Sequence, residues 1–113
     1  MKTKLYHGTN NQNALSILDN GFDFNRCGSN WGSTYGKGIY FTPNLETAKA
    51  YSDDNTIIEV TIDINPFYLT KDKSPSSKKK KLRIPPKYNC IVSPNKDEYI
   101  LIEDFTSEYI KIL

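Results

Sequence analysis

Hydrophobic and polar residues alternate most clearly in the middle of the chain, between residues 55 and 65. In NTIIEVTIDIN, isoleucine or valine stands at positions 58, 60, 62 and 64, with a polar residue between each pair. A period of two places alternate side chains on one face of a β-strand. This segment is therefore predicted to be a strand with one buried face.

Further strands are predicted where β-branched and aromatic residues gather between turn-forming residues. KLYHGT is predicted to be a short strand that stops at Gly8, and KGIYFT a second one. YNCIVS, EYILIED and EYIKIL, close together near the end of the sequence, predict three more. The polar, basic and proline-bounded residues 66–86 predict a loop, with a short strand near Tyr68 or Leu82.

Two helices are predicted in the N-terminal half. The first lies in NNQNALSILDNG, where Asn10 or Asn11 can cap the start and Gly21 can end it. Its apolar stripe is expected to comprise Ala14, Leu15, Ile17 and Leu18. The segment from Pro43 to about Ser52, PNLETAKAYS, predicts the second helix. The fold class is therefore α+β, with two short helices and a mostly antiparallel sheet.

Length and composition agree with one small folded domain over residues 1–113. The net charge of +2 does not indicate a nucleic-acid-binding protein. The chain contains one histidine and two distant cysteines, Cys27 and Cys90, which predict neither a zinc site nor a disulfide framework and are expected to be packing residues. The sequence shows no signal peptide and no apolar run of membrane-spanning length, so a cytoplasmic protein is expected.

Two short stretches suggest chemistry, and each also has a plainer explanation. In His7-Gly8-Thr9, a histidine ends a strand and Gly8 lets a ligand approach the backbone. Taken alone, a simply hydrogen-bonded histidine is the stronger explanation. Glu98 opens an apolar strand, where a carboxylate is either a solvated strand end or a group that stabilises a developing cation.

Residues 36–51 combine glycine and tyrosine in another pattern. Gly36 and Gly38 permit a tight turn before the strand that carries Tyr40. Tyr51 ends the helix that follows, so both rings can reach one pocket and form a slot for a flat ring. The alternative is that Tyr40 lies in the core and Tyr51 packs the helix onto the sheet.

Four motifs in order, LYHGTN, YGKGIYF, AKAY and DEYILIED, resemble the catalytic domain of the poly(ADP-ribose) polymerase-like, or diphtheria-toxin-like, ADP-ribosyltransferases with their His-Tyr-Glu triad. The resemblance covers nearly the whole chain and includes the spacing of 11 residues from Tyr40 to Tyr51. PPKYNCIV resembles a segment of the mono-ADP-ribosylating branch. The resemblance implies the ADP-ribosyltransferase fold with split, mostly antiparallel sheets, NAD+ as co-substrate and no metal.

The resemblance also implies a role for each motif residue. Glu98 would accept a hydrogen bond from the 2′-hydroxyl of the nicotinamide-side ribose and stabilise the oxocarbenium ion of that ribose. His7 would form a hydrogen bond with the adenine-side ribose, and the backbone N–H and C=O of Gly8 would clamp the nicotinamide carboxamide. Tyr40 and Tyr51 would sandwich the nicotinamide ring. His7, Tyr40 and Glu98 form the implied catalytic set.

Four more residues are implied in NAD binding. Thr9 completes the HGT motif, and Gly38 shapes the turn that presents Tyr40. Arg26 lies in a loop that would cover NAD, and it would contact a phosphate or the adenosine of NAD. The family usually has a serine where this chain has Ala48; either Thr47 substitutes, or one hydrogen bond worth ~0.5–1.5 kcal/mol is missing.

Departures from the pattern bear on the acceptor. Lys96 stands two residues before Glu98, where arginine-modifying relatives carry Glu or Gln, so arginine-specific transfer is disfavoured. We expect a monomer that transfers a single ADP-ribose to an unidentified acceptor, a protein before a nucleic acid or a small molecule. Such a stand-alone modifier would also suit delivery into a host cell. The lysines at 78–81 are either a solvated loop or an acceptor-docking surface.

Two alternatives stay open. One is an inactive module of the same fold that binds NAD or ADP-ribose, which Ala48 motivates. The other is an NAD-dependent RNA 2′-phosphotransferase, which shares the fold but should need basic groups for the RNA phosphate, and Glu98 speaks against it.

Overall fold

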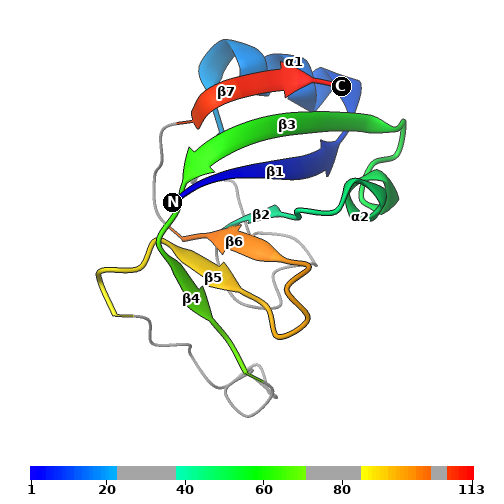
Figure 1. Ribbon diagram of the computed structural model, residues 1–113. Helices are drawn as coiled ribbons and strands as arrows, with labels where there is room; N and C mark the ends of the chain where they lie inside the picture. Colours follow the sequence, from blue (N-terminus) through cyan, green and yellow to red (C-terminus); the bar gives the residue numbers. More distant parts are fainter. Residues whose placement is uncertain (23–37, 71–84, 103–106) are drawn as a thin grey trace.

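The computed structural model describes residues 1–22, 38–70, 85–102 and 107–113 (Figure 1). The elements in chain order are β1 (Lys2–Thr9), α1 (Asn11–Asn20), β2 (Ile39–Phe41), α2 (Leu45–Ala50), β3 (Thr56–Asp63), β4 (Pro66–Tyr68), β5 (Cys90–Val92), β6 (Tyr99–Leu101) and β7 (Ser107–Ile112). The prediction of an α+β fold with mostly antiparallel sheets and two short helices in the N-terminal half is confirmed.

The described strands form two sheets. The first has the order β1-β3-β7 and is antiparallel. The second has the order β2-β6-β5-β4, in which β4 and β5 run parallel and the other pairs antiparallel. A bridge joins the sheets: the N–H of Tyr6 donates to the carbonyl of Thr42 at 2.8 Å, and the reverse bond measures 2.9 Å. β1 and β2 therefore lie side by side in Figure 1.

The main hydrophobic core confirms the alternation along β3. The four alternating apolar side chains in and just after this strand are buried: Ile58, Val60, Ile62 and Ile64. Leu5 of β1 lies opposite Val60 on the same face, and apolar side chains of β2, β5 and β6 pack against them. Cys90 is buried in this core, and burial raises the pKa of its thiol to about 12, so it is the packing residue that was predicted.

α1 has the predicted ends but a narrower apolar stripe. The Asn10 side chain accepts a bond from the Asn13 N–H at 2.8 Å, and Gly21, with φ of 80°, donates its N–H to the Ile17 carbonyl. Ala14 is fully buried and Ile17 packs on the core. Leu15 and Leu18 were wrongly included in the stripe, because they are 55% and 41% exposed. They form a second stripe, about 100° around the helix axis from the first.

α2 is a short helix that lies against β1 and β3 (Figure 1). The Asn44 side chain caps it by accepting a bond from the Glu46 N–H at 3.0 Å, and Tyr51 ends it. A helix of six residues is not stable in isolation, so its place depends on tertiary contacts. Neither α1 nor α2, the helices of the described segments, is long and apolar enough to cross a membrane.

Candidate active site

His7 lies near the end of β1, with its ring packed against two phenylalanines. The ring centroids are 5.4 Å from Phe22 and 5.5 Å from Phe41. His7 Nδ1 lies 2.9 Å from the carbonyl oxygen of Tyr40. Because a carbonyl oxygen only accepts, Nδ1 carries the proton and Nε2 is an acceptor. Burial lowers the pKa of His7 against the opposing effect of the carbonyl bond, so the ring is neutral at pH 7.

Gly8 supports α2 on β1. A Cβ atom at this position would lie 2.0 Å from the carbonyl oxygen of Ala48 and 3.2 Å from Cβ of Tyr51. The side chain of Ala48 is itself fully buried. A glycine is therefore required here by the packing of the helix, which the sequence did not indicate.

The backbone N–H and C=O of Gly8 point to the outer edge of β1. Consecutive residues of a strand direct these groups to opposite edges, so residues two apart direct them to the same edge. Tyr6 directs its groups to Thr42, away from β3, so Gly8, two residues later, directs its own the same way. Because β1 is at the edge of its sheet, this donor–acceptor pair faces outward beside the end of α2.

Tyr40 is the middle residue of β2. It pairs with Ile100 of β6, and its partly buried side chain packs on a small apolar cluster that contains Ile100. Gly38 precedes β2, where a Cβ would lie 2.4 Å from Ile100 Cγ2 and 2.8 Å from the Leu101 carbonyl oxygen. Among the described glycines a positive φ occurs at Gly21 and not at Gly38. Close packing on β6 therefore requires a glycine at position 38, and the predicted tight turn stays a prediction because Gly36 lies outside the described residues.

Glu98 stands directly before β6, on the same face as Tyr40. Phe41 pairs with Tyr99, so the register, if continued by one residue, places Glu98 opposite Thr42 and diagonal to Tyr40, at about 7 Å. The Ser93 N–H donates to the Glu98 carbonyl at 2.9 Å, and the Glu98 N–H donates to Ser93 Oγ at 3.0 Å. These two bonds hold the backbone of Glu98 at the end of the turn that joins β5 and β6.

Tyr51 brings the end of α2 to Glu98. Its hydroxyl donates to Glu98 Oε1 at 3.3 Å, and its side chain is 62% exposed. Burial of the hydroxyl, then the negative charges of Glu98 and Asp97, raise the pKa of Tyr51. The phenol therefore keeps its proton at neutral pH and acts as the donor to the carboxylate.

Asp97 is a site residue that the sequence analysis did not select. Its Oδ1 accepts a bond from Thr42 Oγ1 at 3.0 Å, and its Oδ2 accepts one from Thr47 Oγ1 at 2.9 Å. One of the two alternatives in the sequence analysis was that Thr47 replaces the family's serine and hydrogen-bonds the carboxamide; in this structure its hydroxyl donates to Asp97 instead. No local pattern could have revealed these contacts, because they join residues 50 and 55 positions apart.

The other predicted residues are placed as follows. Thr9 ends β1, and its carbonyl accepts a bond from Ser52 Oγ at 2.5 Å. Arg26, Cys27, Gly36 and the lysines at 78–81 lie outside the described residues. Within the described segments, no group of three or more His, Cys, Asp or Glu residues could hold a metal ion.

The arrangement connects five of the predicted residues through a series of contacts. His7 bonds the backbone of Tyr40, Gly8 supports the helix that ends at Tyr51, and Tyr51 bonds Glu98. The result is a neutral histidine, an outward amide pair, an exposed aromatic ring and a carboxylate around the adjoining ends of β1, β2, α2 and β6. Such a set can hold a flat polar ring and stabilise a positive charge beside it.

Comparison with protein families identifies the N-terminal part of the chain. A family model described as the poly(ADP-ribose) polymerase catalytic domain matches residues 1–62, which is more than half of the chain. The matched region contains His7, Gly8, Tyr40 and Tyr51 and stops before Glu98. No curated protein matches the chain at a significant level.

Proposed function

The chain belongs to the poly(ADP-ribose) polymerase catalytic domain family, and from this premise we propose that it transfers a single ADP-ribose unit from NAD+ to an acceptor and releases nicotinamide. The observation that carries the proposal is the bond between Tyr51 and Glu98. It joins a tyrosine inside the matched region to a carboxylate outside that region, 47 positions away. This hydrogen bond supports a single site that contains Glu98 together with the residues of the matched region.

The backbone of Gly8 supports nicotinamide as the leaving group. A primary carboxamide presents one carbonyl acceptor and one NH2 donor. The outward N–H and C=O of Gly8 match these two groups, and Cβ of Tyr51, a residue that is largely exposed, lies next to Gly8. Stacking of a flat ring on such an aromatic contributes ~0.5–1.5 kcal/mol beyond burial.

His7 supports recognition of a ribose. Its Nε2 is a hydrogen-bond acceptor, because Nδ1–H donates to the Tyr40 carbonyl. The ring carries no positive charge, because burial lowers its pKa. A sugar hydroxyl is a donor that suits such a nitrogen. We therefore propose that His7 Nε2 accepts a hydrogen bond from a hydroxyl of the adenine-side ribose.

Glu98 is proposed to stabilise the reacting ribose. The bond between ribose C1′ and the nicotinamide nitrogen breaks, its electron pair leaves with nicotinamide, and positive charge develops on the ribose. A fixed carboxylate next to this charge contributes on the order of 10²- to 10³-fold in rate, as single electrostatic groups do in other enzymes. The acceptor nucleophile then bonds C1′ and loses its proton.

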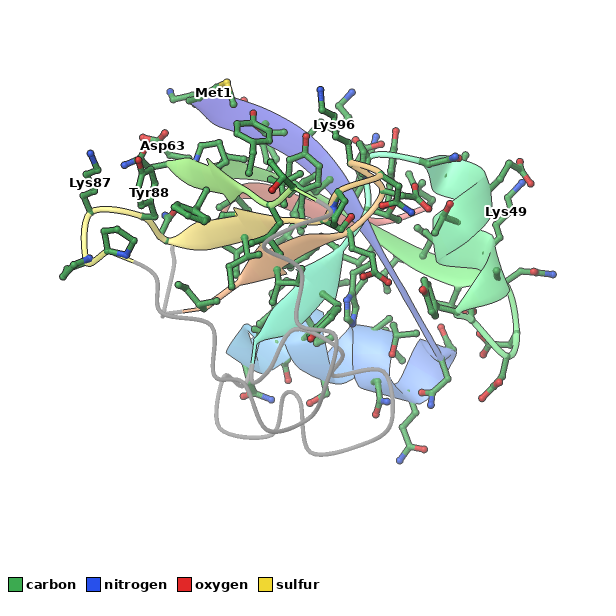
Figure 2. The ribbon with its side chains drawn as sticks, turned by 90° about the horizontal axis from the view of Figure 1, so that it is seen from below. Met1, Lys49, Asp63, Lys87, Tyr88 and Lys96 are labelled. Atoms are coloured by element: carbon green, nitrogen blue, oxygen red, sulfur yellow. The ribbon has the colours of Figure 1, made fainter. Side chains whose placement is uncertain are left out.

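The acceptor is proposed to be a protein, with one ADP-ribose transferred per site. The connection beside Glu98 is short, from Ser93 to Glu98, and offers little surface to a growing polymer. Two exposed lysines flank the site: Figure 2 shows Lys49 on α2 and Lys96 on the turn between β5 and β6, both pointing outward. Lys49 is paired with Glu46 at 3.3 Å, and the charge of Lys96 favours an approaching acidic surface over a basic one.

The proposal is tested by calorimetry of NAD+ binding together with chromatography of the products. The proposed enzyme binds NAD+ and releases nicotinamide over time. Binding without release would instead identify an inactive module that recognises NAD+ or ADP-ribose. Release that requires an RNA with a 2′-phosphate would identify the phosphotransferase.

A further inference from the structure

The carboxylate of Asp97 connects the turn between β5 and β6 to α2 and to Thr42, the residue that follows β2. Oδ1 accepts from Thr42 Oγ1 at 3.0 Å and from Thr47 Oγ1 at 3.2 Å, and Oδ2 accepts from Thr47 Oγ1 at 2.9 Å. The Thr42 side of the contact is buried, since Thr42 is 3% exposed. Hydrogen bonds to a charged acceptor away from water are stronger than neutral ones.

Each threonine connects Asp97 to a different part of the site. Thr42 is bridged by two backbone bonds to Tyr6, in the strand that carries His7 and Gly8. Its hydroxyl also accepts a bond from the Asn44 N–H at 3.1 Å, at the start of α2. Thr47 lies in α2, four residues before Tyr51, and residues four apart share a helix face.

Two parallel contacts therefore join α2 to the turn between β5 and β6. Thr47 bonds Asp97, and one helical turn later Tyr51 bonds Glu98, the next residue along the turn. The turn is itself ordered locally, because the Asp97 N–H donates to Asn95 Oδ1 at 3.1 Å. The first contact fixes the spacing that the second requires.

We propose that Asp97 is a positioning residue, which sets the place of the Glu98 carboxylate relative to the ring of Tyr51 through Thr42 and Thr47. This inference rests on the proposed function. Without Asp97, the packing of Ala48 on Gly8 still seats α2, but the turn that carries Glu98 loses its hydrogen bonds to Thr47 and to Thr42 and keeps only the contact of Glu98 with Tyr51. The carboxylate then no longer stands where positive charge develops, and such misplacements cost up to about 100-fold in rate.

The test measures kcat and KM for nicotinamide release from NAD+ in four single variants. Asp97→Ala should lower kcat by about 10- to 100-fold with little change in KM, because Asp97 acts on Glu98 and not on bound NAD+. Asp97→Asn should recover part of the rate, because an amide can still accept from one threonine and donate to the other. Thr47→Val removes one hydroxyl at similar volume and should lower kcat in the same direction. Asp19→Ala, an exposed residue of α1, is the matched control and should be as active as the wild type.

A double variant separates positioning from general damage. In a Glu98→Gln background, Asp97→Ala should leave the residual rate unchanged, whereas a purely structural defect would lower it again. If Asp97→Ala does not fold, as judged by thermal melting, Thr47→Val with the same background decides the question. A wild type that releases nicotinamide, with Asp97→Ala and Thr47→Val equally fast, would overturn the inference alone. A wild type that releases none would overturn the proposed function and this inference with it.

Discussion

The carbonyl oxygen of Ala48 lies so close above Gly8 that a Cβ on residue 8 would stand 2.0 Å from it. This contact seats α2 on β1 and places Tyr51 beside the outward amide groups of Gly8. The candidate site therefore depends first on this backbone contact between β1 and α2. The hydrogen bond from Tyr51 to Glu98 can form only when the contact has placed Tyr51.

Gly8→Ala is expected to displace α2. Relief of the clash requires the helix backbone to move, so we expect a loss of about 1–3 kcal/mol in the free energy of unfolding and loss of nicotinamide release. Gly21→Ala is the matched control: φ of 80° makes alanine unfavourable by about 1–2 kcal/mol, but nothing lies within 4 Å of the new Cβ. Urea unfolding and product analysis of both variants check this. Equal activity in the two variants would contradict the account.

Tyr51→Phe is expected to separate stacking from hydrogen bonding. The ring remains, so the affinity for nicotinamide should hold, while loss of the donor to Glu98 should lower kcat by roughly 3- to 10-fold. Tyr51→Ala removes both and should also raise KM. Because the pKa of Tyr51 is raised above 10, the phenol stays a donor at all lower pH values, and its contribution is lost only as the pH rises through that raised pKa. Steady-state kinetics of the two variants, with a nicotinamide titration, give the answer; a kcat of Tyr51→Phe equal to the wild type would remove this hydrogen bond from the mechanism.

His7 is expected to make the fold less stable in mild acid. Its pKa is lowered from 6.5 in the folded state, so the unfolded chain binds the proton more readily. The free energy of unfolding is then fully retained above about pH 6.5 and declines as the pH falls toward the folded pKa. The lowered pKa values of Asp54 and Asp63 act only at more acidic pH, as the pH falls below about 3.8.

The test of His7 is unambiguous because the chain contains one histidine. Urea unfolding between about pH 8 and pH 5 should show the decline in the wild type and not in His7→Asn, whose amide nitrogen can still donate to the Tyr40 carbonyl. The same slope in both proteins would assign the decline to other groups.

Much of the fold follows from local patterns in the sequence. The alternation of β3 and the end of α1 at Gly21 were predicted, and the cap at Asn10 is one of the two predicted, because these signals depend on residues close in sequence. Leu15 and Leu18 were misplaced because apolar character alone does not say which stripe of a short helix meets a neighbour. The close packing at Gly38 could not be predicted for a related reason: it comes from Ile100 and Leu101, more than 60 positions away.

The site could be predicted only in part, for a similar reason. His7, Gly8, Tyr40, Tyr51 and Glu98 were selected through motifs, and the contacts among them agree with one site. Asp97 was passed over, because an aspartate beside a glutamate at a strand end is ordinary on its own. Its hydrogen bonds to Thr42 and Thr47 form only when α2 folds against the β5–β6 turn.

The measurement that tests the central claim most directly is the rate of nicotinamide release from NAD+ by the wild type, Glu98→Gln and Glu46→Gln. Glu46 is an exposed residue of α2 whose substitution by glutamine removes the same charge outside the site. We predict release by the wild type and by Glu46→Gln at similar rates, and a rate lower by on the order of 10²- to 10³-fold in Glu98→Gln. Release by Glu98→Gln at the wild-type rate would contradict the assignment of Glu98 as the catalytic carboxylate.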